Sequence, residues 1–216
     1  MTAKKNIPDY LVAYRNAVEQ FGGTFDATLW RSREGQSIRF QTFCDFIDFG
    51  GMTILDVGCG IGDFAQFLID RKIRFEHFHG IDAIDEMIVS AKQRKLRNCT
   101  FETIDIIEHQ ESMLGFDWLT FSGTLNAMAE KKAIELINSS FVASNYGVAF
   151  NFLSNQYRPT YKDKCNLDSA TEDLYPASRF NTTALLEYAF SLTPFVEFTQ
   201  AYLDGHDATI ILRKKK

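Results

Sequence analysis

The sequence is poor in cysteine: four are spread over 216 residues, and no two of them form a CxxC pair. This spacing argues against a zinc site and against a dense disulfide framework. The chain also lacks any apolar run near the ~20 residues of a membrane span. Its start, from Met1 to Asn6, has no apolar core of a signal peptide. These absences predict a cytoplasmic protein with no metal site and no membrane partner.

An excess of positive charge is missing as well. The chain has 23 basic and 28 acidic residues, which gives a formal net charge of −5. Nucleic-acid binding depends largely on cationic contacts to phosphates, so a nucleic-acid partner is disfavoured. Hydrophobic residues make up 45% of the chain and charged residues 24%, the balance of an ordinary globular protein. The 20 Phe and 8 Tyr supply apolar area for a core and for a ligand.

Strand-like and helix-like patterns alternate along the chain. Two helical patterns fill most of the first 50 residues, and each ends at a Gly-Gly pair. Apolar runs that read as strands follow, separated by helical patterns, and two alternating runs near the end predict a hairpin around Asp204-Gly205. The predicted strands cover residues 52–57, 78–81, 100–104, 116–121, 146–153, 195–202 and 208–212.

This alternation predicts an α/β fold: a doubly wound, mostly parallel seven-stranded sheet with a C-terminal antiparallel hairpin strand and N-terminal helices. The length fits a single domain, 1–216. Within it, we expect a helical cap over residues 1–50 and a core over residues 51–213. The connector 154–180 is long for a compact domain, which is typical of a functional, lid-like insertion.

A glycine-rich turn, Gly58-Cys59-Gly60-Ile61-Gly62, stands between a predicted buried strand and a helix. Glycines at such a turn let the backbone approach a ligand closely. The pattern is GxGxG rather than the GxGxxG of dinucleotide sites, and the next residue is Asp63. A carboxylate at the start of a helix disfavours a pyrophosphate there, so the turn favours a cationic or neutral ligand group.

Acidic residues also mark the ends of neighbouring predicted strands. Asp82 ends the second strand, where a carboxylate can accept the two hydroxyl protons of a ribose. Asp105 ends the third strand and could receive an amino group such as that of adenine. Asp56 precedes the glycine turn, where it could order the loop or meet an ammonium group. This set suits a ligand with ribose, adenine and positive charge.

The run Leu55-Asp56-Val57-Gly58-Cys59-Gly60-Ile61-Gly62 resembles motif I of class I S-adenosylmethionine-dependent methyltransferases, which have a Rossmann-like fold. Gly80-Ile81-Asp82 and the segment 101–106 are similar to the next two motifs of that family. The resemblance spans roughly residues 35–213 and includes poorly characterised bacterial members. It implies S-adenosylmethionine as cofactor, with the glycines under it, Asp82 at its ribose and Asp105 at its adenine amine. Together with candidates chosen by side-chain type, the expected cofactor contacts are Arg39, Asp56, Gly58, Cys59, Gly60, Gly62, Asp63, Asp82, Ala83, Met87, Asp105, Ile106, Ser122 and Gly123.

No conspicuous catalytic group accompanies these motifs. In the family, the loop from Ser122 to Asn126 faces the transferable methyl group, and here it lacks the Asp/Asn-Pro-Pro-Tyr sequence of enzymes that methylate base amines. Asn126 could orient an acceptor or cap the following helix, and His206 could act in acid–base chemistry or simply belong to a turn. These two are the only catalytic candidates.

The remaining candidates are open between a ligand contact and ordinary packing. Arg39 could bind the methionine carboxylate or lie on the surface of its helix. A substrate pocket could be closed by Tyr14, Trp30, Asn126, Tyr157 and Arg158, although each is also a common packing residue.

The sequence therefore predicts an S-adenosylmethionine-dependent methyltransferase with a small-molecule acceptor. A nicotinamide-dependent oxidoreductase would share the fold and Asp82, but Asp63 argues against it. The other alternative is a module that binds S-adenosylmethionine without catalysis. The sequence names neither the acceptor nor the oligomeric state.

Overall fold

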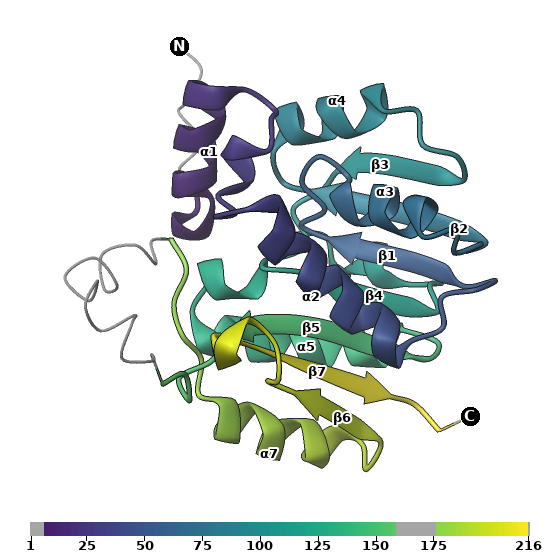
Figure 1. Cartoon of the computed structure of the whole chain (residues 1–216), viewed down its shortest axis with the longest axis vertical. Coiled ribbons are helices and arrows are strands. Elements are labelled where there is room, and N and C mark those ends of the chain that lie inside the picture. Colours follow the sequence, from purple (N-terminus) through teal and green to yellow (C-terminus); the bar gives the residue numbers. More distant parts are fainter. Residues whose placement is uncertain (1–6, 159–175, 216) are drawn as a thin grey trace.

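A computed structural model describes residues 7–158 and 176–215. Its centre is a seven-stranded sheet in the order β3-β2-β1-β4-β5-β7-β6 (Figure 1). The strands are β1 (Thr53–Val57), β2 (His77–Asp82), β3 (Cys99–Thr103), β4 (Trp118–Phe121), β5 (Gly147–Leu153), β6 (Val196–Thr199) and β7 (Asp207–Arg213).

The first five strands run parallel, and the last strand is antiparallel to both of its neighbours. β1 pairs with β2 and β4, and β5 extends this parallel part of the sheet. The chain then passes β5 to form the edge strand β6 and returns as β7 between the two. The prediction of a doubly wound, mostly parallel seven-stranded sheet with an antiparallel hairpin strand is confirmed.

Helices cover both faces of the sheet, as Figure 1 shows. The two hydrophobic clusters place α2, α3 and α4 on one face and α5 and α7 on the other. The helices are α1 (Asp9–Phe21), α2 (Arg33–Phe46), α3 (Asp63–Asp70), α4 (Asp85–Gln93), α5 (Glu130–Ala143) and α7 (Thr182–Leu192), and short 3-10 turns include η1 (Asp26–Thr28) and η3 (Leu125–Ala127).

Much of the aromatic content lies in the core beneath α2 and α3. The ring of Phe64 lies 5.0 to 6.0 Å from those of Phe40, Phe43, Phe49 and Phe78, measured between centroids. Such pairs add to the stabilisation from buried area alone. The cluster fixes α3, and hence the glycine turn that precedes it, against the sheet.

The two N-terminal helices predicted within residues 1–50 have different positions. α2 packs on the sheet through Phe40 and Phe43, and it starts at Arg33 because the Ser32 hydroxyl accepts a hydrogen bond from the Gly35 amide, at 3.0 Å. α1 instead lies beside the carboxyl ends of the strands (Figure 1). The lid-like insertion predicted at 154–180 falls mostly on residues 159–175, which lie outside the described residues.

Candidate functional site

A cavity of about 970 Å³, including its open mouth, lies at the carboxyl ends of β1 to β4. This position is the usual ligand site of an open α/β sheet. α1 closes one side. The lining residues are Tyr10, Leu11, Tyr14, Thr28, Trp30, Gln36, Phe40, Asp56, Val57, Gly58, Cys59, Gly60, Asp63, Asp82, Ala83, Ile84, Met87, Ile104, Asp105, Ile106, Ile107, Ser122, Gly123, Thr124, Ala127 and Met128.

The glycine turn requires its glycines. Gly58 and Gly62 have φ of +72° and +80°, in the left-handed region that favours glycine. A β-carbon on Gly58 would lie 2.4 Å from the Thr124 hydroxyl oxygen, and one on Gly62 would lie 2.9 Å from the Phe101 ring. The backbone of the turn therefore lies directly against its neighbours, where a side chain would not fit.

Asp82 is held by the turn that follows β1. Its two carboxylate oxygens accept hydrogen bonds from the amides of Gly60 and Ile84, both at 2.9 Å. Burial raises the pKa of Asp82, and these backbone donors partly oppose that rise. Each carboxylate oxygen can accept more than one hydrogen bond. Asp82 can therefore bind the hydroxyls of a ligand while it keeps the turn in place.

Asp105 has a partner that the sequence did not reveal. Its Oδ2 accepts a hydrogen bond from the Tyr10 hydroxyl at 2.6 Å, and its Oδ1 accepts one from the Ile107 amide at 3.0 Å. Burial and the adjacent carboxylate raise the pKa of Tyr10. A ligand amine at Asp105, as predicted from the resemblance, would share this carboxylate with α1. Tyr10 lies one helical turn before Tyr14, and this i,i+4 spacing is the signal that could have found it.

Asp56 is buried at the inner end of the cavity. The Thr120 hydroxyl donates a hydrogen bond to it at 2.8 Å. Burial raises the pKa of Asp56 to about 7, against the lowering effect of that hydrogen bond. Near neutral pH this carboxyl exists in both protonation states, so it can meet either a cationic or a neutral ligand group.

The charge of Asp63 is balanced within the chain. Arg94 contacts it at 2.7 Å, the Gln36 amide donates to it at 3.3 Å, and Arg33 lies 3.9 Å away. The negative charge that the sequence places at the start of α3 is thus paired with basic and amide side chains of the same chain. These partners follow Asp63 by 31 residues or precede it by about 30, and no local pattern marks them.

Arg39 binds a carboxylate of its own chain. Its guanidinium makes a bidentate contact with Asp207 at 2.7 and 2.6 Å, and it does not contact the cavity. Arg39 was predicted to hold a ligand carboxylate, but its guanidinium is already paired with Asp207. The other reading, a surface arginine, was wrong, because the side chain is buried.

The two catalytic candidates also lie outside the lining. Asn126 donates to the Ser178 carbonyl at 2.6 Å and accepts from the Leu153 amide at 3.1 Å, so it links η3 to β5. His206 Nδ1 lies 2.8 Å from Asp207 Oδ2. Among the residues predicted to contact substrate, Tyr14 and Trp30 line the cavity, whereas the other described ones do not.

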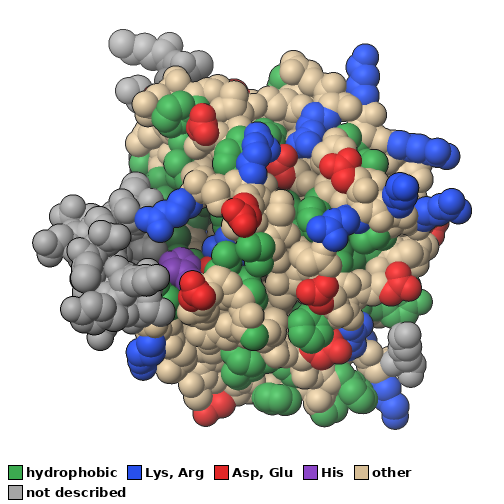
Figure 2. Space-filling view, viewed as in Figure 1, with side chains coloured by type: hydrophobic (Ala, Val, Ile, Leu, Met, Phe, Trp, Pro, Cys, Tyr) green, Lys and Arg blue, Asp and Glu red, His purple; other side chains and the backbone are tan. Residues whose placement is uncertain are grey.

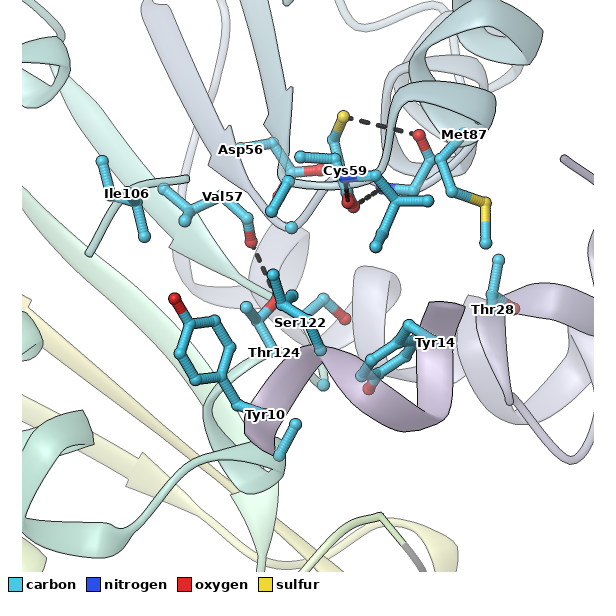
Figure 3. A pocket seen from close by; sticks show the side chains of 18 of the residues that line it. Tyr10, Tyr14, Thr28, Asp56, Val57, Cys59, Met87, Ile106, Ser122 and Thr124 are labelled. Atoms are coloured by element: carbon cyan, nitrogen blue, oxygen red, sulfur yellow. Dashed lines mark hydrogen bonds between the residues drawn. The ribbon is translucent and has the colours of Figure 1, made fainter. Parts of the chain in front are cut away.

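Tyr157 and Arg158 are the two described substrate candidates from the segment after β5, and neither lines the cavity. The ring of Tyr157 meets that of His206 edge-on, with centroids 5.1 Å apart. Arg158 is exposed and donates to the carbonyls of Asn155 and Tyr157. In the close-up of Figure 3, Tyr10 and Tyr14 come instead from α1 and lie across the cavity from Asp56, Cys59 and Met87.

A family model described as a methyltransferase domain matches residues 48–179, more than half of the chain. The chain belongs to this methyltransferase family. The matched segment contains the glycine turn, Asp82 and Asp105 and ends just before α7. No curated protein matches the sequence.

Solved methyltransferases share the fold at low sequence identity. Magnesium protoporphyrin IX methyltransferase from Synechocystis, solved with bound S-adenosylhomocysteine, is 14% identical, with a TM-score of 0.64 over 94% of this chain and 93% of that one. A methyltransferase from Archaeoglobus fulgidus is 16% identical, with a TM-score of 0.63 over 85% and 95%. The small RNA methyltransferase HEN1 is 17% identical, with a TM-score of 0.65 over 83% of this chain and 25% of that one.

The protein is thus a methyltransferase that uses S-adenosylmethionine. The cavity fits this cofactor in its chemistry: the described lining has four carboxyl groups, Asp56, Asp63, Asp82 and Asp105, and contains no Lys or Arg. When bound, the cofactor supplies a sulfonium-activated methyl group. Neither a nicotinamide-dependent oxidoreductase nor a binding module without catalysis is supported by the family.

Within residues 7–158 and 176–215, no helix has the length and apolar character needed to cross a membrane. The same residues contain no group of His, Cys, Asp and Glu side chains arranged to hold a metal ion.

Proposed function

We propose that the cavity holds S-adenosylmethionine against the glycine turn and Asp82, and that the methyl acceptor is a small molecule bound between α1 and the loop after β4. The observation that carries this proposal is the charge of the lining: it has no Lys or Arg among its described residues and holds the carboxyl groups of Asp56, Asp82 and Asp105, besides Asp63, which is paired with Arg94. Such a surface attracts a sulfonium and an amine, and it repels phosphate.

The shape of the site supports a small acceptor. α1 lies across the cavity and is tied to it by the hydrogen bond from Tyr10 to Asp105. Tyr14 and Trp30 add aromatic walls. An acceptor must therefore enter a cleft that is covered by a helix, which favours a compact molecule over a polymer.

Nucleic acid is the competing class, since similar folds include a small RNA methyltransferase as well as a porphyrin methyltransferase. Polymer binding needs a cationic surface next to the site. In the view of Figure 2, Lys and Arg side chains are scattered singly over the coloured surface, with several at the upper right and only isolated ones at the left, toward which the carboxyl ends of β1 and β3 point (Figure 1). This distribution favours the small molecule.

The chain's own side chains contribute to the transfer by binding and orienting the methyl donor and the acceptor, and by excluding water from them. A sulfonium methyl group is already activated, so positioning and desolvation can supply most of the rate enhancement. The aromatic rings of Tyr14 and Trp30 and the side chain of Met87 provide a largely apolar enclosure. A general base is needed only where the acceptor must lose a proton early.

Cofactor placement is tested by titration calorimetry with S-adenosylmethionine and S-adenosylhomocysteine. Asp82→Asn keeps the shape of the side chain, removes its charge and replaces one of the two oxygens that accept the Gly60 and Ile84 amides. We expect affinity for both ligands to fall about tenfold or more. Asp70→Asn is the matched control, because Asp70 is an exposed carboxylate that also accepts a hydrogen bond, from Gln66 at 2.8 Å. Unchanged affinity in Asp82→Asn would contradict the placement.

The acceptor class is tested with radiolabelled methyl donor and two panels. One panel contains small amines, phenols and carboxylic acids, and the other contains RNA and DNA oligonucleotides. Label in a small molecule, absent from the oligonucleotides, is the expected result. Label in the oligonucleotides alone would overturn the small-molecule assignment while leaving the cofactor site intact.

A further inference from the structure

We propose that the buried ion pair of Arg39 and Asp207 fixes Trp30 as a wall of the cavity next to the loop after β4. Trp30 then limits the size of the group that the methyltransferase admits beside the transferable methyl. This role rests on the proposed function, which places the acceptor on that side of the cavity. Arg39 and Asp207 are positioning residues, since neither lines the cavity itself.

The ion pair has a fixed geometry. Arg39 Nε and Nη2 donate to the two carboxylate oxygens of Asp207 at 2.7 and 2.6 Å, and Nη1 donates to the Gly35 carbonyl at 2.8 Å. The exposed fractions of Arg39 and Asp207 are 8% and 2%. A bidentate pair of this kind sets the plane of the guanidinium as well as its position. The pair also joins α2 to β7, since Arg39 and Asp207 are 168 residues apart in sequence.

Trp30 is held between this guanidinium and the loop after β4. The guanidinium carbon of Arg39 lies 4.6 Å from the centroid of the Trp30 ring, within the range of a cation–π contact. On the other side, a β-carbon at Gly123 would lie 2.5 Å from Cζ2 of Trp30. The ring edge therefore lies against the backbone of Gly123, whose amide is itself fixed by the Asn151 side chain at 2.9 Å.

A contribution to folding stability does not by itself explain why the chain has this buried ion pair. Replacing a buried ion pair with well-packed apolar side chains is often neutral or stabilising. A flat guanidinium over an indole, however, supplies an orientation that an aliphatic side chain cannot. Trp30 lies in the irregular connector between η1 and α2, so regular secondary structure does not fix it and these side-chain contacts must.

The chain offers a matched control in its second tryptophan. Arg213 lies 5.0 Å from the Trp118 ring and contacts Glu197 at 2.9 Å, which repeats the arrangement of Arg39, Trp30 and Asp207. Trp118 is buried in the core and does not line the cavity. Loss of Arg213 removes a similar stack without touching the site.

The first measurement follows Trp30 by fluorescence. Trp30 and Trp118 are the only two tryptophans, so Trp118→Phe leaves Trp30 as the single emitter. In that background, the double variant Arg39→Met with Asp207→Asn removes the stack and leaves no unpaired buried charge. We expect acrylamide quenching of Trp30 to rise at least about twofold, and its anisotropy to fall, as a packed side chain becomes mobile.

Arg213→Met in the same background, where Phe stands in place of Trp118 beneath the guanidinium, still removes an arginine–carboxylate pair outside the site and should leave Trp30 unchanged. A circular dichroism melt shows whether each variant is folded. Arg39→Lys, which keeps the charge but not the planar fork, should give an intermediate quenching value. Equal quenching in the double variant and its parent would overturn the positioning role.

The second measurement tests the size limit by calorimetry with S-adenosylmethionine and its S-allyl analogue. In the parent protein, we expect the allyl analogue to bind about tenfold or more weakly, because the added carbons meet Trp30. Trp30→Ala, and to a lesser extent the double variant, should narrow this ratio. A ratio unchanged by Trp30→Ala would overturn the size limit. If neither ligand binds the parent protein, the proposed function fails instead, and the fluorescence result still decides whether Arg39 positions Trp30.

Discussion

At the scale of single residues, protonation is the property most sensitive to the fold. Asp56 is buried beside Thr120, and its pKa of about 7 means that the folded chain binds this proton more tightly than the unfolded chain does. The folded state therefore gains from Asp56 at low pH and loses that gain as the pH rises from about 4 to above 7. The ionised form of Asp56 destabilises the folded state because its charge is buried, and none of the causes of its pKa shift is a cationic side chain.

Asp56→Asn should remove this pH dependence. The Asn carbonyl can still accept the Thr120 hydroxyl, so the variant should gain stability relative to the parent between pH 5 and pH 8. The gain is bounded by about 4 kcal/mol, the free energy that corresponds to a pKa raised from 3.8 to about 7. Urea unfolding of both proteins at the two pH values measures it, with Asp70→Asn as control. A stability difference that is the same at both pH values would contradict the assignment.

The predicted site residues differ in how well the sequence predicts their position. Gly58, Asp82 and Asp105 follow predicted strands directly, and the ends of parallel strands meet at one edge, so local pattern alone brings them together. Arg39 and Asn126 could not be placed in this way. Their partners, Asp207 and Ser178, come from distant segments of the chain, and only the packing of α2 against β7, and of η3 against the segment before α7, brings them into contact.

At the scale of elements, α1 is held to the site by a small hydrophobic cluster, in which Ala17 and Val18 pack with Ile61, Ile84 and Met87, and by a few polar contacts. It is not part of the sheet layers, and its ties to the cavity include the Tyr10 hydroxyl on Asp105 and the contact of Arg15 with Glu86 at 3.3 Å and with the Ala83 carbonyl at 3.0 Å. Elements with few buried contacts open more easily than the core. The cover over the cavity can therefore open while the sheet stays folded.

Tyr10→Phe should make that opening more frequent. A hydrogen bond to a charged group is worth about 1.5–3 kcal/mol, so amide hydrogen exchange in residues 9–21 should accelerate about tenfold or more, whereas exchange in β1 and β4 should not change. Mass spectrometry of the exchanged peptides measures both. Tyr188→Phe in α7 is the control, because it removes a tyrosine hydroxyl far from the cavity. Equal exchange in Tyr10→Phe and the parent would show that Asp105 does not hold α1.

The elements themselves were largely predictable, because hydrophobic periodicity is a local signal. Asn181 is a residue type favoured at the start of a helix, and it caps α7 with its side chain accepting from the Ala184 amide at 3.1 Å. The sequence predicted a helical cap over residues 1–50, but it did not predict that α1 lies beside the cavity while α2 packs on the sheet face. Both helices show an apolar stripe, and a stripe gives the buried side of a helix without its partner.

At the scale of the whole molecule, charge is distributed unevenly. The chain carries a formal charge of −5, and four carboxyl groups converge on one cavity whose described lining has no basic side chain. Low-dielectric walls focus the field of such a cluster toward its mouth. S-Adenosylmethionine carries one more positive charge than S-adenosylhomocysteine, so the same cavity should discriminate between donor and product by electrostatics.

This discrimination should weaken with salt. Between 0.05 and 0.5 M NaCl, the Debye length falls from roughly 14 Å to roughly 4 Å, and attraction of the sulfonium by the carboxyl groups is screened. We expect the dissociation constant of S-adenosylmethionine to rise severalfold more over this range than that of S-adenosylhomocysteine, measured by calorimetry at pH 8, where Asp56 is mostly ionised. At pH 6 the difference should shrink, because Asp56 is then mostly protonated. Equal salt dependence for the two ligands would mean that the carboxyl groups shape the cavity without attracting the sulfonium, and Asp56→Asn should in that case leave the salt dependence unaltered.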